Sequence, residues 1–178
     1  MKTILLTGAA GFIGSNTATA LLARGDRVVG VDNLNDYYDP ARKHANLEEV
    51  RAEAPDPEKF LFHRADIRDE REMDRIFAEH EPDVLIHLAA MAGVRASMDN
   101  PRLYLDVNLN GTLTLLDVAQ RHGQPPIVFA STSSVYGRTK VIPFIESDRA
   151  DRPLAPYPAS KRAAELLGHS YHHLYGQN

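Results

Sequence analysis

The feature that most constrains the fold is a glycine-rich turn near the start of the sequence, between an apolar run and a helix-compatible segment. Ile4-Leu5-Leu6 precedes the turn, its glycines are Gly8, Gly11 and Gly14, and the segment Asn16 to Arg24 follows it. A strand, a glycine turn and a helix in this order place a diphosphate at the helix N-terminus, where free N–H groups and the positive dipole end face the anion. Gly8 would allow the tight turn, Gly11 a close approach to phosphate, and Gly14 close packing of the helix on the strand. Three glycines alone fit an ordinary turn equally well, so the rest of the chain decides.

Short apolar runs alternate with longer helix-patterned segments along the whole chain. The predicted strands are Ile4–Leu6, Val28–Val31, Phe60–Phe62, Val84–Leu88 and Ile127–Ala130. The predicted helices are Phe12–Arg24, Pro40–Ala52, Arg68–His80, Pro101–His122 and Pro158–Tyr175, with Arg51–Lys59 as a surface loop. Strands alternating with helices predict an α/β fold, a three-layer doubly wound parallel sheet of the Rossmann type, in a single domain over residues 1–178.

Composition excludes several classes of function. The net charge of -4 comes without a basic run, which argues against nucleic acid or an anionic membrane as the main partner. The chain has no cysteine, so neither a disulfide framework nor thiolate chemistry is available. No apolar segment approaches the roughly 20 residues that span a bilayer, and the first apolar run is too short for a signal peptide. We therefore expect a soluble cytoplasmic protein.

An acidic residue at the end of the second predicted strand points to the cofactor. Asp32 lies 18 residues after Gly14, where a carboxylate accepts hydrogen bonds from the adenosine ribose and repels a 2′-phosphate. No arginine stands beside it in Asn33-Leu34-Asn35, so the sequence favours NAD over NADP. The alternative is a solvated aspartate at a strand end. Lys43 could contact the cofactor, but the simpler interpretation is a helix-surface lysine. Arg95 could reach a substrate phosphate or carboxylate, but the simpler interpretation is a solvated loop arginine.

Two further segments are candidates for the cofactor site. Asp66-Ile67 follows the third predicted strand, where the pair could flank adenine or Asp66 could cap the next helix. Leu88-Ala89-Ala90 follows the fourth strand, and small residues there allow a flat cofactor to lie close to the sheet. A tightly packed turn would select the same small residues.

The chemistry is predicted to lie after the fifth strand. Four consecutive hydroxyl residues, Ser131 to Ser134, are placed to bind a polar substrate, and Tyr157 and Lys161 follow at the i, i+4 spacing that shares a helix face. A free tyrosine has a pKa of about 10, which a neighbouring cation lowers by about 1–3 units. The Tyr157 phenolate is therefore a plausible general base near neutral pH.

Taken together, these motifs resemble the extended short-chain dehydrogenase/reductase family, among the NAD-dependent nucleotide-sugar epimerases and dehydratases. The resemblance rests on Thr7-Gly8-Ala9-Ala10-Gly11-Phe12-Ile13-Gly14, Asp32-Asn33, Asp66-Ile67, His87-Leu88-Ala89-Ala90, Ser131-Thr132-Ser133-Ser134-Val135-Tyr136-Gly137 and Tyr157-Pro158-Ala159-Ser160-Lys161. Finer features resemble UDP-glucuronate 4-epimerases: Asp32-Asn33-Leu34-Asn35-Asp36-Tyr37-Tyr38-Asp39-Pro40, Ala92-Gly93-Val94-Arg95 and Tyr171-His172-His173-Leu174-Tyr175-Gly176.

The resemblance implies a mechanism and a set of residues. Tyr157 would take the proton of the sugar 4-hydroxyl as C4 gives hydride to NAD, and hydride would return to the other face of the 4-keto sugar. Thr132 would bind the 4-oxygen, Lys161 would hold the nicotinamide ribose and tune Tyr157, and no metal is implied. The implied cofactor-binding residues are Gly8, Gly11, Phe12, Ile13, Gly14, Asp32, Asn33, Asp66, Ile67, Leu88, Ala89, Ala90, Tyr157 and Lys161. The implied substrate-binding residues are Thr132, Ser133, Ser134 and Tyr157.

Residues 133 and 134 favour one branch of the family. Dehydratases carry Asp-Glu after the threonine and UDP-glucuronate decarboxylases resemble them in having Glu at the second position, whereas this chain has Ser133-Ser134. Hydroxyls can donate to a substrate carboxylate, so the expected substrate is a UDP-hexuronate and the expected reaction epimerises UDP-glucuronate to UDP-galacturonate. The alternatives are a decarboxylase, another nucleotide-sugar epimerase or dehydratase, and a catalytically silent NAD-binding module.

The resemblance covers only the N-terminal half of the family pattern. We therefore expect the strands beyond the fifth, and most of the lobe that grips uridine diphosphate, to be missing from this sequence, which leaves an apolar sheet edge. In the resembling family, helices equivalent to 101–122 and 158–175 form a two-fold dimer interface. A homodimer through these helices is the corresponding hypothesis.

Overall fold

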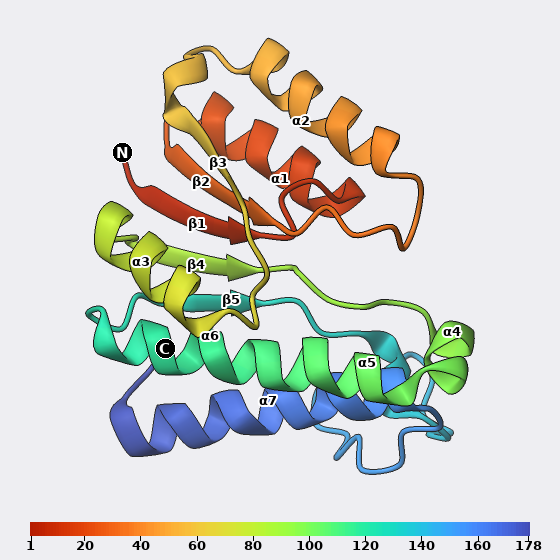
Figure 1. Ribbon diagram of the computed structural model, residues 1–178. Coiled ribbons are helices and arrows are strands. Elements are labelled where there is room, and N and C mark those ends of the chain that lie inside the picture. The colour runs from red at the N-terminus through yellow and green to blue at the C-terminus, as the bar shows by residue number, and fades with distance from the viewer.

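The computed structural model describes residues 1–178, and its centre is a five-stranded parallel sheet (Figure 1). The strands are β1 (Thr3–Thr7), β2 (Arg27–Asp32), β3 (Phe60–Arg64), β4 (Val84–His87) and β5 (Ile127–Phe129). Their order across the sheet is β3-β2-β1-β4-β5, so the order reverses at β1, which pairs with β2 on one side and β4 on the other. The expected doubly wound parallel sheet is confirmed.

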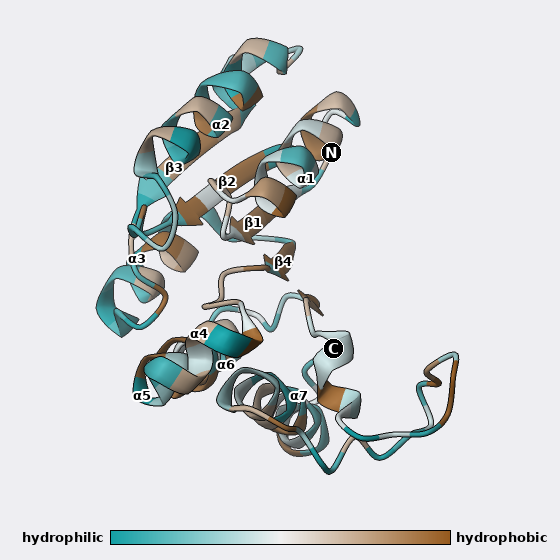
Figure 2. Ribbon diagram, turned by 90° about the vertical axis from the view of Figure 1, so that its right-hand side faces the viewer, coloured by the Kyte–Doolittle hydropathy of each residue, from teal (hydrophilic) through white to brown (hydrophobic).

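Helices cover the sheet on both faces (Figures 1 and 2). One face carries α1 (Phe12–Ala23) and α2 (Pro40–Glu53), and the other carries α3 (Glu70–His80), α6 (Gly111–Arg121) and α7 (Pro156–Tyr175). Shorter elements complete the chain: α4 (Val94–Asp99), α5 (Pro101–Leu105), the π-helical segment η2 (Asp106–Asn110), and the 3-10 turns η1 (Pro57–Lys59) and η3 (Ser133–Tyr136). None of these helices has the length and apolarity that crossing a membrane requires.

Each face of the sheet has its own apolar core. The alternation of side chains along a strand sends Ile4 and Leu6 of β1 toward α1 and α2, where Leu22 and Val50 are buried, and sends Leu5 toward α3 and α6. On that second face the core includes Phe77, Leu115 and Val118. Burial on both faces explains why the inner strands are apolar at nearly every position.

The elements predicted from sequence differ from the structure most at five places. Residues 101–122 form α5, η2 and α6 in succession, with a π turn in the middle. Helix α7 begins at Pro156, two residues before the predicted start at Pro158, so Tyr157 lies inside the helix. Helix α4 was not predicted, and the segment expected as a loop at 51–59 contains the end of α2 and η1. Helix α3 begins at Glu70, with Asp69 as its N-cap.

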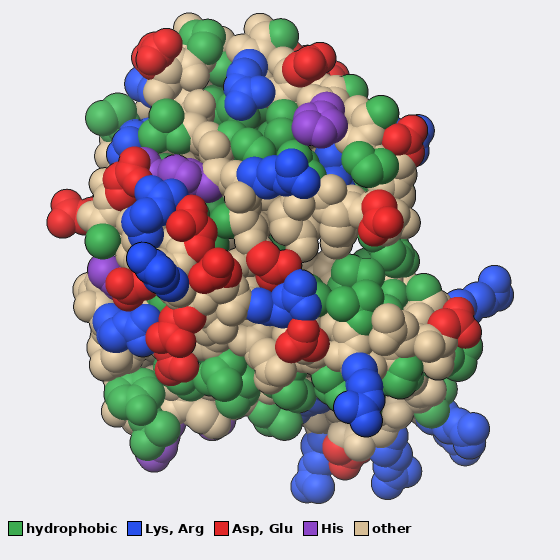
Figure 3. Space-filling view, viewed as in Figure 1, with side chains coloured by type: hydrophobic (Ala, Val, Ile, Leu, Met, Phe, Trp, Pro, Cys, Tyr) green, Lys and Arg blue, Asp and Glu red, His purple; other side chains and the backbone are tan.

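The outer side of β5 is only partly covered. The backbone N–H of Ile127 donates to the carbonyl of Asn178 at 2.6 Å, so the predicted bare edge is paired at one position. Val128, on the face opposite α6, is 57% exposed. Elsewhere on the surface, acidic and basic side chains are intermixed (Figure 3), as in the Arg75–Glu72 and Arg75–Glu79 pairs of α3.

Candidate active site

The glycine turn between β1 and α1 is shaped by close backbone contacts. Gly8 has φ of +73°, and a Cβ on Gly14 would lie 2.0 Å from the Gly8 carbonyl oxygen, so helix α1 rests directly on the turn. Gly11 is the N-cap of α1 and offers no side chain. The N–H groups of Phe12, Ile13 and Gly14 consequently have no acceptor in the protein. Three free donors at a helix N-terminus form an anion site.

A cavity of about 130 Å³ opens beside this turn, at the carboxyl ends of β1, β2 and β4. It lies where the strand order reverses, which is the usual ligand crevice of such sheets. Nine of the residues predicted to bind cofactor line it: Gly8, Gly11, Asp32, Asn33, Asp66, Ile67, Leu88, Ala89 and Ala90. Phe12, Ile13, Gly14, Tyr157 and Lys161 do not line it.

Asp32 is buried in this cavity and paired with Lys43. Its carboxylate accepts from the backbone N–H groups of Leu34 (2.8 Å) and Ala10 (3.2 Å), and the Lys43 ammonium lies 3.2 Å from Asp32 Oδ1. Lys43 also donates to Asn35 Oδ1 at 2.8 Å and is only 5% exposed. The interpretation of Lys43 as a surface lysine was therefore wrong, because α2 turns this residue inward.

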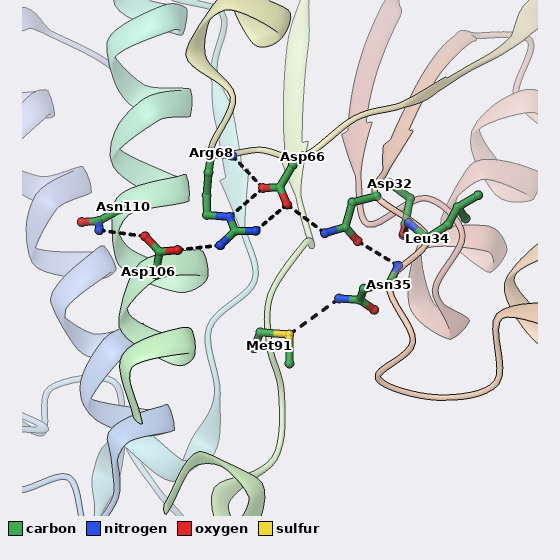
Figure 4. Close-up of polar contacts among 9 residues, drawn as sticks. Asp32, Leu34, Asn35, Asp66, Arg68, Met91, Asp106 and Asn110 are labelled. Carbon is green, nitrogen blue, oxygen red and sulfur yellow. Dashed lines mark hydrogen bonds and ion pairs between the residues drawn. The ribbon is translucent and has the colours of Figure 1, made fainter. Parts of the chain in front are cut away.

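Asp66 is held by an arginine rather than capping a helix (Figure 4). Arg68 donates to both carboxylate oxygens through Nε and a terminal nitrogen, at 2.9 and 2.8 Å, and Asn33 Nδ2 donates at 3.0 Å. These bonds, led by the Arg68 side chain, hold the pKa of Asp66 well below its usual range. Arg68 continues to Asp106 of η2 at 2.5 Å, which ties the cavity floor to the π turn.

The second part of the site is the start of α7. Tyr157 and Lys161 lie one turn apart there, and the Tyr157 ring packs edge-on against Tyr104 with centroids 6.1 Å apart. The Lys161 ammonium, 2% exposed by residue, lies 4.0 Å from the Phe129 ring centroid and has no hydrogen-bond acceptor in the protein. Burial lowers the pKa of Lys161 to about 8, partly offset by Glu165.

The hydroxyl residues after β5 lie beside α7. Thr132 caps η3 by accepting the N–H of Ser134 at 3.2 Å, which leaves the Thr132 hydroxyl proton free for another acceptor. Ser131 donates to Glu165 of α7, and η3 contacts the same helix. Ser133 is exposed and its hydroxyl has no partner in the protein. Arg95 is exposed as expected, on α4.

Asn108 in the π turn joins the two parts of the site, and sequence reasoning missed it. Its side chain accepts from the N–H of Met91 at 2.7 Å and donates to the Met91 carbonyl at 2.9 Å and to Ser160 Oγ at 3.0 Å. Ser160 in turn donates to the carbonyl of Tyr157 at 2.8 Å. The loop after β4 and the first turns of α7 are thus fixed relative to each other by one buried amide.

A directed chain of hydrogen bonds runs through buried His87. The Thr112 hydroxyl donates to the Asn108 carbonyl at 2.6 Å, so Thr112 must accept from His87 Nε2 at 3.0 Å. His87 Nδ1 then accepts from the Thr7 hydroxyl at 2.7 Å, and Thr7 accepts from the Ala89 N–H at 3.2 Å. Burial, with a smaller effect of Lys161, lowers the pKa of His87 to about 3, so the ring is neutral.

One cluster of metal-ligand type lies outside this site. His63 Nε2 and His80 Nε2 are 2.7 Å apart, and Glu79 Oε1 is 3.6 Å from His80 Nε2. The Nδ1 atoms of these histidines face the guanidinium groups of Arg75 (3.4 Å) and Arg27 (3.3 Å). A histidine bound to metal through Nε2 carries its proton at Nδ1 and needs an acceptor there. Guanidiniums supply only donors, so we assign this cluster no metal.

The residues of the main site fit a dinucleotide. Phe12, Ile13 and Gly14 supply free donors for a diphosphate, and the turn admits no Cβ at Gly14. Asp32 offers a carboxylate in the adjoining cavity. Near the start of α7, Lys161 Nζ donates to no acceptor in the protein, so it can donate to a bound hydroxyl group.

Comparison with known proteins agrees with this arrangement. The family model described as GDP-mannose 4,6 dehydratase matches residues 5–178. A UDP-glucuronate 4-epimerase of Thermodesulfobacterium geofontis is 46% identical over 172 residues, which cover 97% of this chain and 52% of that protein. The chain spans about half the length of the curated relatives it matches.

Solved structures give the same picture. UDP-glucose 4-epimerase from Bifidobacterium longum, in complex with NAD⁺ and UDP, superimposes with a TM-score of 0.86 at 36% identity, covering 96% of this chain and 49% of that one. UDP-glucuronic acid 4-epimerase from Bacillus cereus, in complex with UDP-glucuronic acid and NAD, has a TM-score of 0.86 at 33% identity, covering 98% and 53%.

Proposed function

Because the chain belongs to the family described as GDP-mannose 4,6 dehydratase, we propose that it is the NAD-binding part of a nucleotide-sugar 4-epimerase. The observation that carries the proposal is the start of α7, where Tyr157 stands one turn from a buried lysine that has no acceptor. A relative with 46% identity and structural neighbours, all named as 4-epimerases, support the reaction class. In this proposal residues 1–178 form one cofactor-binding domain.

The cofactor roles follow from the two parts of the site. The free N–H groups of Phe12, Ile13 and Gly14 bind the diphosphate, with Gly8 and Gly11 keeping the approach open. Asp32 and Asn33 face the adenosine ribose, and Asp66 and Ile67 border the adenine. The cavity wall after β4 consists of Leu88, Ala89 and Ala90, and the two alanines leave room for the cofactor. NAD⁺ would supply the hydride acceptor for C4 of the sugar and return the hydride in the second half of the reaction.

Asp66 lies beside the proposed adenine position, but its carboxylate has no hydrogen-bonding capacity left for the base. Its four hydrogen-bonding directions already receive the Arg68 side chain, the Arg68 N–H and Asn33. We therefore assign Asp66 the role of fixing the loop after β3, with Ile67 providing the apolar contact. A Cβ on Gly111 would lie 2.6 Å from Ile67 Cδ1, so α6 leaves room for Ile67 at this position.

The proton chemistry belongs to Tyr157, Lys161 and Thr132. Tyr157 takes the proton from the sugar 4-hydroxyl, and Lys161, one helical turn further on, holds the nicotinamide ribose. Thr132 has a free hydroxyl proton with which to hold the 4-oxygen. Since the Lys161 pKa is about 8, the lysine is mostly cationic at pH 7 and still within reach of titration.

The substrate class is inferred from the residues after Thr132. Ser133 and Ser134 cannot exchange protons as an Asp-Glu pair does, and their hydroxyls can donate to a carboxylate. We therefore propose UDP-glucuronate as substrate and UDP-galacturonate as product. Release of CO₂ from UDP-glucuronate would show a decarboxylase instead. NAD binding without any turnover would show a catalytically silent module.

A homodimer is proposed through the helices at 101–122 and 158–175. Three leucines on these helices are well exposed, Leu105 (43%), Leu166 (53%) and Leu174 (65%), which is consistent with burial against a second copy. A mass measured by light scattering at micromolar concentration tests this part separately. A monomeric mass would refute the homodimer and leave the cofactor assignment unchanged.

The deciding experiment is calorimetric titration of the chain with NAD, followed by UDP-glucuronate, with Asp32→Ala in parallel. We expect saturable NAD binding that weakens about tenfold or more in Asp32→Ala, because a buried carboxylate acceptor is lost. Conversion of UDP-glucuronate to the 4-epimer, abolished in Tyr157→Phe, would support the full function. A folded chain without NAD affinity would refute it.

A further inference from the structure

The buried lysine beside Asp32, Lys43, has no role among the cofactor-binding residues described above. Lys43 lines the same cavity as Asp32, and its charge lies 3.2 Å from the carboxylate. The side chains are 6% and 8% exposed, so solvent screens the pair little. Helix α2 places Lys43 there because Lys43, Leu47 and Val50 share its buried stripe.

Hydrogen-bond capacity remains on both partners. An ammonium has three donors, and Lys43 uses two, on Asp32 Oδ1 and Asn35 Oδ1. Asp32 Oδ1 already accepts from both Lys43 and the Leu34 N–H, whereas Asp32 Oδ2 accepts only from the Ala10 N–H. One Lys43 donor and one Asp32 acceptor site thus have no protein partner in the cavity, and a ribose offers two hydroxyls that could use them.

The charge balance bears on the choice between cofactors. A lone carboxylate at this place repels a 2′-phosphate. Here the cation compensates that carboxylate, so Asp32 and Lys43 together present no net charge to the ribose. Of the remaining neighbours in the cavity, Asn33, Asn35, Tyr37 and Tyr38 carry no charge at neutral pH, and Asp66 is paired with Arg68.

We propose that Lys43 is a cofactor-binding and selectivity residue: it donates to the adenosine ribose and, by compensating Asp32, leaves the site with measurable affinity for NADP. The inference rests on the proposed NAD site and deepens it. Selectivity belongs to the ion pair rather than to Asp32 alone. Removing Lys43 sharpens the preference for NAD, and removing the charge of Asp32 reverses it.

The test compares dissociation constants for NAD and NADP by calorimetry in wild type and variants. In wild type we expect NADP to bind between about 10-fold and 100-fold more weakly than NAD. In Lys43→Met the dissociation constant for NADP divided by that for NAD rises at least tenfold, because the 2′-phosphate then meets an uncompensated carboxylate. In Lys43→Arg, which keeps the charge, this ratio stays within threefold of the wild-type value. In Asp32→Asn the ratio falls at least tenfold.

Arg42→Gln is the matched control, because Arg42 is the exposed neighbour on the same helix. An equal change in Lys43→Met and Arg42→Gln would show a long-range charge effect and overturn the proposal, as would an unchanged ratio in Lys43→Met. Should Lys43→Met fail to fold, the proposal is tested by measuring how tightly the wild-type protein binds adenosine 2′,5′-bisphosphate and 5′-AMP. Saturable binding of the bisphosphate within 100-fold of 5′-AMP supports the proposal, and its absence overturns it. Absence of NAD binding in folded wild type would instead refute the proposed function.

Discussion

Replacing Asn108 by alanine should destabilise this protein more than any other single change in the π turn. Asn108 is 1% exposed and its amide makes three hydrogen bonds, to the N–H and carbonyl of Met91 and to Ser160 Oγ. Alanine removes all three and leaves the two backbone groups of Met91 buried without these partners. The substitution therefore separates the loop after β4 from the start of α7.

The magnitude follows from the number of bonds. A buried hydrogen bond contributes about 1 kcal/mol net, and an orphaned buried polar group costs about 1–3 kcal/mol. Three lost bonds give a destabilisation of about 3 kcal/mol, with about 5 kcal/mol as the upper end. Ser160→Ala removes the bond from Asn108 and the bond to the Tyr157 carbonyl, and should cost about 2 kcal/mol. In the double variant the costs should not add, because Asn108 and Ser160 share a bond.

Urea unfolding followed by circular dichroism measures these free energies directly. Asn110→Ala is the control, because Asn110 lies in the same π turn, is exposed, and makes a single bond to Asp106. We expect it to change stability by less than about 0.5 kcal/mol. Equal stabilities of Asn108→Ala and Asn110→Ala would refute the conclusion that Asn108 holds the two parts of the site together.

Other predictions concern titration and the glycine turn. Lys161 has a folded pKa of about 8 against 10.5 when free, so only the unfolded chain keeps that proton between these values. The stability of wild type relative to Lys161→Met should therefore rise with pH across this window, by at most about 1.4 kcal/mol per pH unit in urea titrations. His87 has a folded pKa of about 3 against 6.5, so stability should fall as pH drops from 6.5 toward 3, and His87→Gln should flatten that slope. Gly14→Ala should cost about 3 kcal/mol in thermal or urea unfolding and abolish NAD binding, because its Cβ meets the Gly8 carbonyl at 2.0 Å. Gly168→Ala, with open space around it in α7, should be neutral or stabilising by up to about 1 kcal/mol, and a cost equal to that of Gly14→Ala would contradict the steric account.

The sheet and its helices were predictable because the inner strands are buried on both faces. Continuous apolar runs such as Val28–Val31 carry that signal locally, and the spacing of the glycines and Asp32 predicted a crevice at the carboxyl ends of the strands, where the cavity lies. The burial of Lys43 also had a local signal. Leu47 and Val50 lie four and seven residues beyond it, so the apolar period of α2 already pointed Lys43 inward.

Other features had no local signal. Nothing in the residues 106–110 distinguishes a π turn from an α-helix, because the turn is fixed by long-range contacts of Asn108 and by Arg68 reaching Asp106. The position of Lys161 over Phe129 likewise depends on where side chains from separate elements meet. Residue types sufficed to predict candidate site residues, whereas the hydrogen bonds that connect them could be found only from the fold.

The π turn also sets the rotational phase of the helix that contains it. A π turn takes up one residue more than an α turn, so it shifts the rotational phase of everything after it by about 100° relative to an uninterrupted α-helix. Tyr104 and Leu115 are 11 residues apart (115 − 104 = 11), which would place them within about 20° of each other in a regular helix. With the π turn between them they differ by about 80°, and both are buried in the same core. Straightening 106–110 into a regular helix of the same length would therefore rotate one of the two side chains away from its present packing. Deleting one residue there would remove the extra residue and leave the two side chains in their present relative phase.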